Sequence, residues 1–447
     1  MALLFATFLP ALLHAAGERP DPRLTPAQLL LAEVQDVRLA GLLREVLDRN
    51  PGLAALEARV RSVAERPAQA RSLPDPNASV TAYLETPETR VGPQRATLTL
   101  SQKFPWFGKR GLRERAAVHE GSAARAHLES TRLERLTQAR VYYHEIGFLD
   151  TYHALTGSDR DTLRHFEELA RARYASGIGL QQDVLKVQTE ITRVETKLLR
   201  ITEQRARAVA ALNALRNHRE GASIETVPLP DPFRVALDRI DLEKAAVERR
   251  PEMERAAAEI ERAATLVALA RKDSDPDITL GVNYGFVGSR DDPAAGLASI
   301  EDDGQDILGI SVGLNLPVRR ARRTAQVREA VEQRAAVEGQ KEQLAAQIRR
   351  SVEELAARIP LIWSQLRLFD DVLVRQSEES LRLAVSAYAT GSVNALDLLD
   401  AERILLEART AGARARADYL IAVARLEGVI ARPLDRPAGE GGQSHAR

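Results

Sequence analysis

Residues 277–286 read DITLGVNYGF, a run in which apolar and polar side chains alternate without a break. Successive side chains of a β-strand point to opposite faces of the sheet, so this run predicts a strand with one apolar and one polar face. Three further stretches alternate in the same way: 77–85, 96–101 and 308–316. Three of the four runs hold nine or ten residues, about the 9–11 that a tilted strand needs to cross a bilayer, and the six residues 96–101 form the partner of 77–85. The sequence therefore predicts four membrane-spanning strands.

The polar faces of these strands carry hydroxyls, amides and glycines, which suit a wet lumen, while the apolar faces suit lipid. A soluble two-faced sheet alternates in the same way and is the alternative interpretation. Small barrels need about eight strands, so four strands do not close one. An open edge in lipid leaves backbone groups unpaired at a cost of several kcal/mol each. If the strands span a membrane, the barrel must be shared between copies of the chain.

Long helical stretches follow the strands. Apolar residues recur at three- and four-residue steps over 110–173, 183–215, 320–387 and 397–430. A helix of some 60 residues is about 90–100 Å long, which exceeds a globular domain and favours coiled-coil or barrel staves. Gly157-Ser158 and Pro360 are the expected interruptions.

The chain also repeats itself. Asp75-Pro76 recurs as Asp275-Pro276, and the turn Tyr174-Ala175-Ser176-Gly177 recurs as Tyr388-Ala389-Thr390-Gly391. Because the landmarks keep their order, we predict two copies of one unit, each with a strand hairpin and a long helical hairpin. The predicted repeats cover 18–217 (strands within 77–104, helices within 108–217) and 239–432 (strands within 277–316, helices within 320–430). A proline-containing linker, 218–238, joins them, and the tail 433–447 is expected to be disordered.

Composition excludes several classes of protein. The 447 residues hold 63 Lys+Arg against 63 Asp+Glu, so no overall charge attracts nucleic acid. The absence of Cys removes disulfides, thiol nucleophiles and an N-terminal lipid-modified Cys. The eight His have no metal-binding spacing and no phosphate-binding glycine motif occurs, so we expect no enzyme, metal site or cofactor.

The N-terminus predicts a secretory signal. Leu3 to Leu13 form a short apolar run, and Ala15-Ala16-Gly17 follows as a small-residue cleavage site. No basic residue precedes the run and Pro10 lies inside it, so an apolar N-terminus of a cytosolic protein is the alternative. We assign 1–17 as the expected signal peptide.

Three groups of residues carry a family resemblance. They are Asn50-Pro51-Gly52-Leu53 with its repeat Arg250-Pro251-Glu252-Met253, the junction SQKFPWFGKR at 101–110, and the two Tyr-x-x-Gly-x5-Asp-[Val/Leu]-Leu turns. On these motifs the chain resembles the TolC family of outer-membrane efflux channels over about 38–432. The resemblance implies a mainly α fold, in which a long antiparallel α-helical coiled-coil barrel joins four transmembrane β-strands per chain. It also implies a homotrimer in the outer membrane with a twelve-stranded barrel, extending into the periplasm.

The same resemblance implies partners, namely a periplasmic adaptor protein and an inner-membrane pump of the RND or ABC type. The junction at 101–110 looks most like the heavy-metal and general efflux branch. A type I protein-secretion duct and, from another class, a soluble coiled-coil scaffold are the alternatives. The four alternating strands have no use in an ordinary scaffold.

The two turns are the candidate functional sites. Gly177 and Gly391 suit the positive φ of a tight helix–helix turn, and Asp183 and Asp397 should begin the returning helices. The resemblance implies that these turns, with Tyr174 and Tyr388, are tips where the adaptor docks. It further implies a pore gate at Asp397 and Asp400, where three chains would gather six carboxylates; Lys186 occupies the matching position of the first turn. Helix capping alone is the alternative role of these aspartates.

A second candidate site follows the second strand. Aromatic and cationic side chains at the end of a strand suit a membrane-interface belt, and simple packing at a sheet–helix junction is the alternative. The residues are Phe104, Trp106, Phe107, Lys109 and Arg110. The segments 86–94 and 288–305, the latter acidic, are the expected outer loops.

Overall fold

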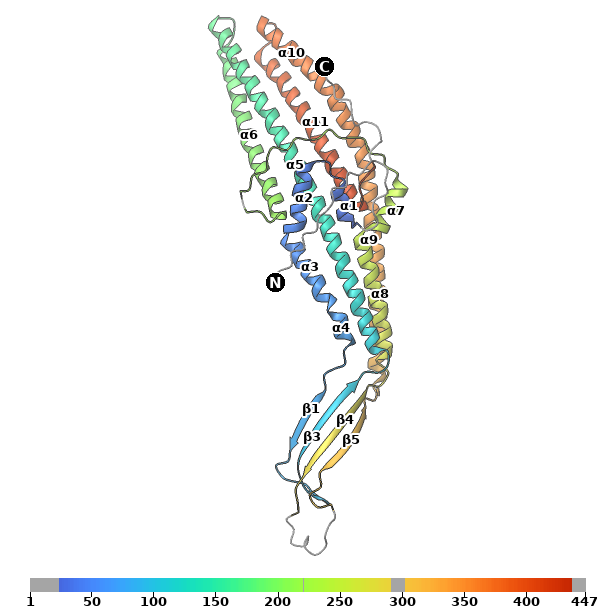
Figure 1. The fold of residues 1–447 in the computed structure, drawn as a ribbon. Helices are drawn as coiled ribbons and strands as arrows, with labels where there is room; N and C mark the ends of the chain where they lie inside the picture. The colour runs from blue at the N-terminus through green and yellow to red at the C-terminus, as the bar shows by residue number, and fades with distance from the viewer. Residues whose placement is uncertain (1–23, 220, 291–301, 436–447) are drawn as a thin grey trace. The chain divides into compact units, whose positions relative to one another are not determined.

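The structure is a computed structural model that describes residues 24–219, 221–290 and 302–435. The predicted signal peptide, most of the tail and the centre of the acidic loop lie outside the described residues. The chain is mainly helical with one antiparallel sheet (Figure 1). It divides into two compact units, one of 1–53, 129–250 and 348–447, and the other of 54–128 and 251–347. Each unit therefore takes segments from both halves of the chain.

The second unit contains the sheet and the helices next to it. Its elements are most of α3 (Pro51–Ala64), α4 (Arg66–Arg71), β1 (Asn77–Ala82), β2 (Glu88–Thr89), β3 (Gly92–Phe104), α8 (Pro251–Lys272), β4 (Ile278–Val287), β5 (Ile307–Leu314), and the first parts of α5 (Lys109–Ala175) and α9 (Arg320–Leu368). The strands occur at the four alternating stretches of the sequence. β1 is shorter than the predicted stretch, β3 is longer, and the short β2 lies in the expected loop 86–94.

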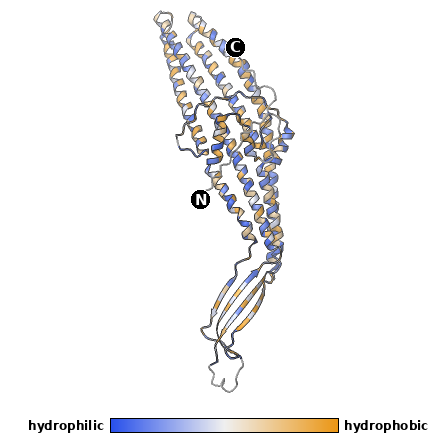
Figure 2. Ribbon diagram, in the orientation of Figure 1, coloured by the Kyte–Doolittle hydropathy of each residue, from blue (hydrophilic) through white to orange (hydrophobic). Residues whose placement is uncertain are grey.

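The strands pair in the order β1-β3-β4-β5, all antiparallel, with β2 paired to β3. Leu98 lies opposite Val80 on one side and Tyr284 on the other, and Tyr284 lies opposite Leu308. This register places most apolar residues of the four long strands on one face, where Val80, Leu100, Val282 and Ile310 are exposed. Figure 2 shows apolar residues recurring along the strands.

The other face of the sheet is polar and closely packed. The Thr99 hydroxyl donates to Asn283 Oδ1 at 2.9 Å. A Cβ at Gly281 would approach Ser311 Oγ to 2.5 Å, so a larger residue there would require the Ser311 side chain to move. The two faces therefore differ in chemistry over the whole width of the sheet.

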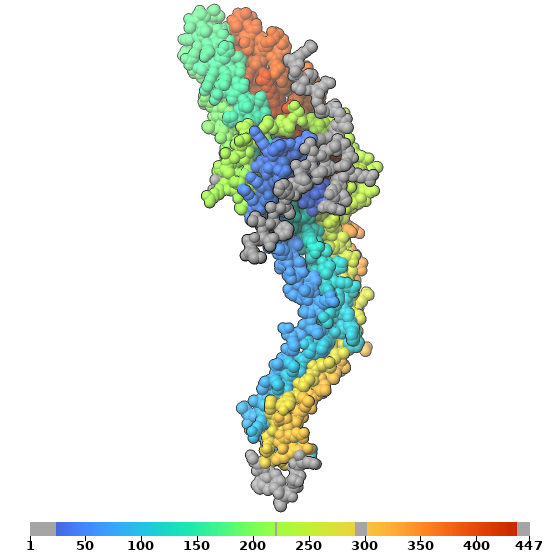
Figure 3. Space-filling view, viewed as in Figure 1, coloured from blue at the N-terminus to red at the C-terminus, as the bar shows by residue number. Residues whose placement is uncertain are grey.

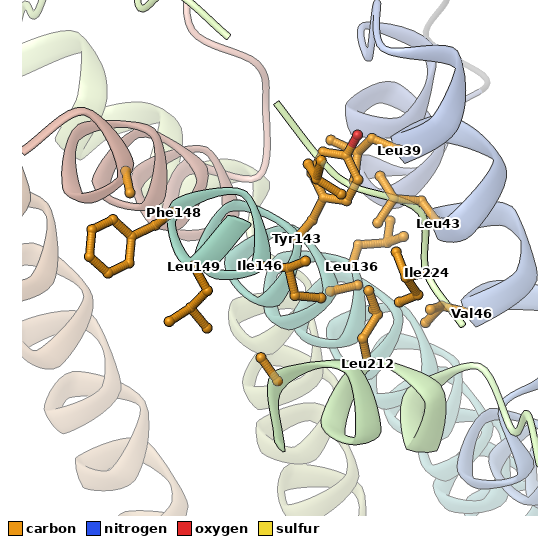
Figure 4. Packing of buried hydrophobic residues seen from close by; sticks show 14 of the residues in the cluster. Leu39, Leu43, Val46, Leu136, Tyr143, Ile146, Phe148, Leu149, Leu212 and Ile224 are labelled. Carbon is orange, nitrogen blue, oxygen red and sulfur yellow. The ribbon is translucent and has the colours of Figure 1, made fainter. Parts of the chain in front are cut away.

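The first unit is a set of helices around an apolar core. Its elements are α1 (Pro26–Ala32), α2 (Val37–Arg49), α6 (Gln181–Leu215), α7 (Arg239–Arg249), α10 (Val374–Thr390), α11 (Ala395–Ile430), and the remainder of α5 and α9. The core joins α2, α5 and α6 and includes Leu43, Leu136, Tyr143, Ile146 and Leu212 (Figure 4). Tyr143 donates its hydroxyl to Asp36 at 2.5 Å, and Asp36 also caps α2. No helix of the described residues is long and apolar enough to cross a membrane.

The expected helix interruptions are wrong. α5 continues through Gly157, and α9 continues through Pro360 between the buried residues Ile359 and Ile362. One glycine costs a helix only about 1 kcal/mol, and burial of the flanking residues offsets the proline penalty. The irregularity lies instead at a π-helical turn, Phe369–Leu373, which packs against Gly412 of α11.

The predicted linker is held against the first unit. Asp150 accepts a hydrogen bond from Val227 N at 2.9 Å, and Arg205 donates to the Ile224 carbonyl at 2.9 Å. Further along, the Tyr419 hydroxyl donates to the Phe233 carbonyl at 2.7 Å. The linker has no helix or strand in its described part, but its backbone is bound by side chains of the long helices.

We predict that Gly428→Ala lowers stability, because its Cβ would collide with the hydroxyl of Thr137. Thr137 cannot easily turn away, since it is β-branched and donates to the Leu133 carbonyl at 2.9 Å. The expected loss is about 1–3 kcal/mol, measured as a lower thermal midpoint of the detergent-purified protein by circular dichroism. Gly157→Ala is the matched control; nothing lies within 4 Å of its Cβ, and it should raise stability by about 0.5–1 kcal/mol. Equal effects of the two changes would contradict the packing described.

Candidate functional site

The two helix–helix turns have the backbone that the sequence predicts. Gly177, between α5 and α6, has φ 78°, and Gly391, between α10 and α11, has φ 86°. The positive φ confirms the interpretation of both glycines. At the first turn the N–H groups of Ile178 and Gly179 both donate to the Arg173 carbonyl at 3.0 Å, which closes the end of α5.

The aspartates of the two turns differ in their local bonds. Asn394 caps α11 by accepting from the backbone of Leu396 at 2.8 Å and of Asp397 at 3.2 Å. Asp397 accepts in return from Asn394 N at 3.3 Å, which completes a capping box. Asp183 lies in the first turn of α6, whose N-cap Leu180 offers no side-chain acceptor. The capping role is therefore observed for Asp397, whereas Asp183 acts on α6 through its charge.

Tyr388 joins the two turns. Its side chain is 1% exposed and packs in a cluster with Leu163, Phe166 and Leu398. The Arg173 guanidinium lies 4.5 Å from the centre of the ring and also donates to the Tyr388 carbonyl. Burial and the Asp183 carboxylate raise the pKa of Tyr388, although Arg173 acts in the opposite direction. The structure thus brings Tyr388 and Asp183 into one site, with Arg173, which the sequence did not single out.

Other residues of the turns are exposed to solvent in a single copy of the chain. Tyr174 is 51% exposed, and the large apolar residues Ile178, Leu180 and Leu396 are exposed as well. Asp400 forms an ion pair with Arg403 on the same face of α11. An exposed apolar surface beside a carboxylate pair is therefore present at this end of the helices.

At the junction between the sheet and α5, Asp277 is the centre of a buried charge network. It accepts from Lys109 Nζ at 2.8 Å and from the backbone N–H of Trp106 at 3.1 Å, and Lys103 Nζ lies 3.1 Å away. Burial alone would raise the pKa of Asp277, but these partners outweigh it and lower the pKa to about 2. Asp277 was not expected as a site residue, and only its place before a strand distinguished it in the sequence.

Lys109 has the packing role that was the alternative to an interface belt. Its side chain is 3% exposed, and its ammonium also donates to the Asp275 carbonyl at 2.8 Å. A buried ammonium needs a carboxylate partner, and Asp277 supplies it. Lys109 therefore ties the start of α5 to the start of β4.

The remaining residues of the junction lie nearer the surface. Phe107 is 80% exposed and meets Trp106 edge-on with ring centres 5.8 Å apart. Arg110 donates through Nε to the Arg71 carbonyl at 2.7 Å. Together with Phe104, Ile278 and Leu280 they line a pocket of about 390 Å³ at the helix-side end of the apolar sheet face.

The histidines of α5 do not form a site among the described residues, where no group of three or more His, Asp or Glu could hold a metal ion. His144 is 7% exposed, and burial lowers its pKa to about 3, with Arg140 acting in the same direction. His144 is therefore uncharged at neutral pH.

We predict that Asp277→Asn destabilises the protein by about 3–5 kcal/mol, because it leaves the buried Lys109 ammonium without its partner. The double variant Lys109→Met/Asp277→Asn should recover much of this loss. Asp273→Asn is the control, since Asp273 lies 3.9 Å from the same ammonium but is 46% exposed, and its loss should cost less than about 1 kcal/mol. Thermal unfolding in detergent measures all three, and no recovery in the double variant would contradict the pairing.

The chain matches the family "Outer membrane efflux protein" over residues 42–218 and 242–432. It is 25% identical to the cobalt-zinc-cadmium resistance protein CzcC of Cupriavidus metallidurans over 345 residues, which cover 76% of this chain and 77% of that one.

Solved structures share the fold. The outer membrane protein VceC of Vibrio cholerae aligns with TM-score 0.74 at 24% identity, covering 89% of this chain and 97% of that one. The open state of the Neisseria gonorrhoeae MtrE outer membrane channel aligns with TM-score 0.70 at 19% identity, covering 88% and 89%. Because the family match covers most of the sequence, the chain belongs to the outer membrane efflux protein family and is an efflux channel of the outer membrane.

Proposed function

We propose that three copies of the chain form a passive exit duct that carries solutes from an inner-membrane pump, through a periplasmic adaptor, to the exterior. The main support for this proposal is the chemistry of the two faces of the sheet and its open edges. Its apolar face is continuous from β1 to β5, its other face is polar, and the outer edges of β1 and β5 have no strand partner among the described residues. Such a sheet suits lipid on one side and a wet lumen on the other.

The open edges favour association of three copies. β1 and β5 lie at the two sides of the sheet (Figures 1 and 3). In lipid, each unpaired backbone group costs several kcal/mol, so β5 of one copy should pair with β1 of the next. Three copies with four long strands each would close a twelve-stranded barrel, wide enough for a channel. The duplicated order of elements, proposed as two repeats, supplies two strands from each half.

The helix ends are the proposed docking tips for the adaptor. Around Gly177 and Gly391 the chain exposes Tyr174, Ile178 and Leu396, which would be buried on binding. The Arg173 side chain reaches Tyr388 across the two turns, so both turns would be presented as one surface. The pump would be of the RND or ABC type.

Asp397 and Asp400 are the proposed pore gate. Around a three-fold axis they would form a ring of six carboxylates, which attracts cations and repels anions. The relative CzcC is a cobalt-zinc-cadmium resistance protein, so divalent metal ions are our first candidate for the cargo, with drugs as the second. The belt of Phe104, Trp106, Phe107 and Arg110 would lie at the membrane interface.

The shared barrel predicts a covalent trimer from engineered cysteines. The natural chain has no Cys, so Val80→Cys on β1, combined in turn with Leu308→Cys, Ile310→Cys or Val312→Cys on β5, introduces the only thiols. At least one pair should give a disulfide-linked trimer on oxidation, seen on a non-reducing gel, because neighbouring β-carbons in paired strands lie about 4.5–5.5 Å apart. Val80→Cys alone is the control and should remain a single chain. Failure of all three pairs would contradict the shared barrel.

The gate predicts a change in conductance. Asp397→Asn with Asp400→Asn removes both charges, but the amide oxygen introduced at position 397 can still accept from Asn394 N in the capping box. In planar bilayers the double variant should lose cation selectivity and be blocked several-fold less strongly by multivalent cations. Asp183→Asn, which removes one carboxylate from the other turn, is the control and should change block less. Unchanged selectivity and block in the double variant would exclude the carboxylate ring.

A further inference from the structure

The segment that leaves β5 is strongly basic. Residues 307–328 contain five arginines and no Asp, Glu or Lys. The arginines are Arg319, Arg320, Arg322, Arg323 and Arg328, and we name them the arginine cluster. They occupy the end of the β5–α9 connection and the first turns of α9.

The arginine cluster has no internal counterion among the described residues. The other end of the sheet differs, since Arg90 pairs with Asp302 at 3.0 Å and Arg290 with Glu88 at 3.6 Å. Near the helix side of the sheet, Arg71 pairs with Glu114 at 3.5 Å. The charge of the cluster is therefore left for a partner outside the chain.

The position of the cluster is also locally unfavourable. The N-terminus of a helix carries partial positive charge, which favours acidic residues in the first turn. The first turn of α9 has none, and the first acidic residue of that helix is Glu329. A bound anion would offset the positive charge of the arginines and of the helix end, and it would accept hydrogen bonds from the free backbone N–H groups there.

An apolar surface adjoins the cluster. The outward residues of β5 and of the connection that follows are exposed, with Ile310 at 83% and Val318 at 78%. Leu314, at the end of β5, lies opposite Ile278, which lines the pocket of about 390 Å³ with Trp106 and Phe107. The arginine cluster therefore follows β5 at the end of the apolar face that contains this pocket.

We propose that the arginine cluster and the adjoining apolar face bind an anionic phospholipid. Guanidinium groups donate paired hydrogen bonds to the phosphate, and the acyl chains lie on β5 and in the aromatic pocket. The proposal rests on the proposed function, since it needs this sheet to lie in lipid. A second copy of the chain fits less well, because the segment from α4 to β1 carries a single carboxylate, Asp75, together with two further cations, Arg66 and Arg71.

The test uses the full-length protein in detergent, titrated with phosphatidylglycerol or phosphatidylcholine and measured by native mass spectrometry. Arg319→Gln/Arg322→Gln is compared with Arg349→Gln/Arg350→Gln, which removes two exposed arginines farther along α9. Wild type and control should prefer phosphatidylglycerol. The cluster variant should lose about fivefold in that preference per arginine, or about twenty-five-fold in all, and the wild-type preference should weaken with salt.

The outcomes separate the two proposals. A wild type that binds both lipids equally, or a cluster variant that keeps its preference, would overturn the lipid site. Loss of the trimer in the cluster variant alone, seen by light scattering, would assign the arginines to a subunit contact and also overturn it. Bilayer conductance is measured in parallel: a channel that conducts without anionic-lipid preference leaves the proposed duct intact, whereas no conductance from any variant would count against the duct itself.

Discussion

The antiparallel pairing of β3 with β4 is the contact on which the sheet and its surroundings depend. It joins residues of the first half of the chain to residues of the second, from Gln94 with Val287 to Phe104 with Ile278. Because side chains alternate with a period of two, a shift by one residue would move the apolar residues of one strand to the polar face. The same register places Asp277, just before β4, within reach of Lys103 and Lys109. The continuous apolar face and the buried ion pair are thus consequences of one pairing.

Features set by neighbouring residues could be predicted from the sequence. The alternation at 277–286 became β4, and the glycines at 177 and 391 have the positive φ that their turns require. These follow from local periodicity and from backbone sterics, which a single segment contains. Features set by distant contacts could not be predicted. Lys109 looks like any cation after a strand until Asp277 is folded against it, and the π-helical turn at Phe369–Leu373 depends on its packing against Gly412.

At the candidate site, the two helix–helix turns also have features that the sequence alone could not predict. The sequence pattern treats them as copies, but Asn394 and Asp397 form a capping box at the second turn, while Leu180 offers no cap at the first. Arg173 then connects them by donating to the Tyr388 carbonyl and lying over its ring. Nothing in the sequence near Arg173 distinguishes it from the other arginines of α5, since its role comes from a residue more than two hundred positions away.

The balance of 63 basic and 63 acidic residues conceals an uneven distribution. Along the helices many charges pair at three- or four-residue spacing, as in Arg171 with Glu167 and Arg334 with Glu338. Exposed pairs of this kind contribute about 0.3–0.5 kcal/mol each, so they keep long helices soluble more than they stabilise the fold. Five arginines with no acidic residue among them lie where β5 leaves the sheet, beside an exposed apolar face. A chain with no net charge can therefore still present a strong local field, and it does so at the end of the sheet that meets the helices.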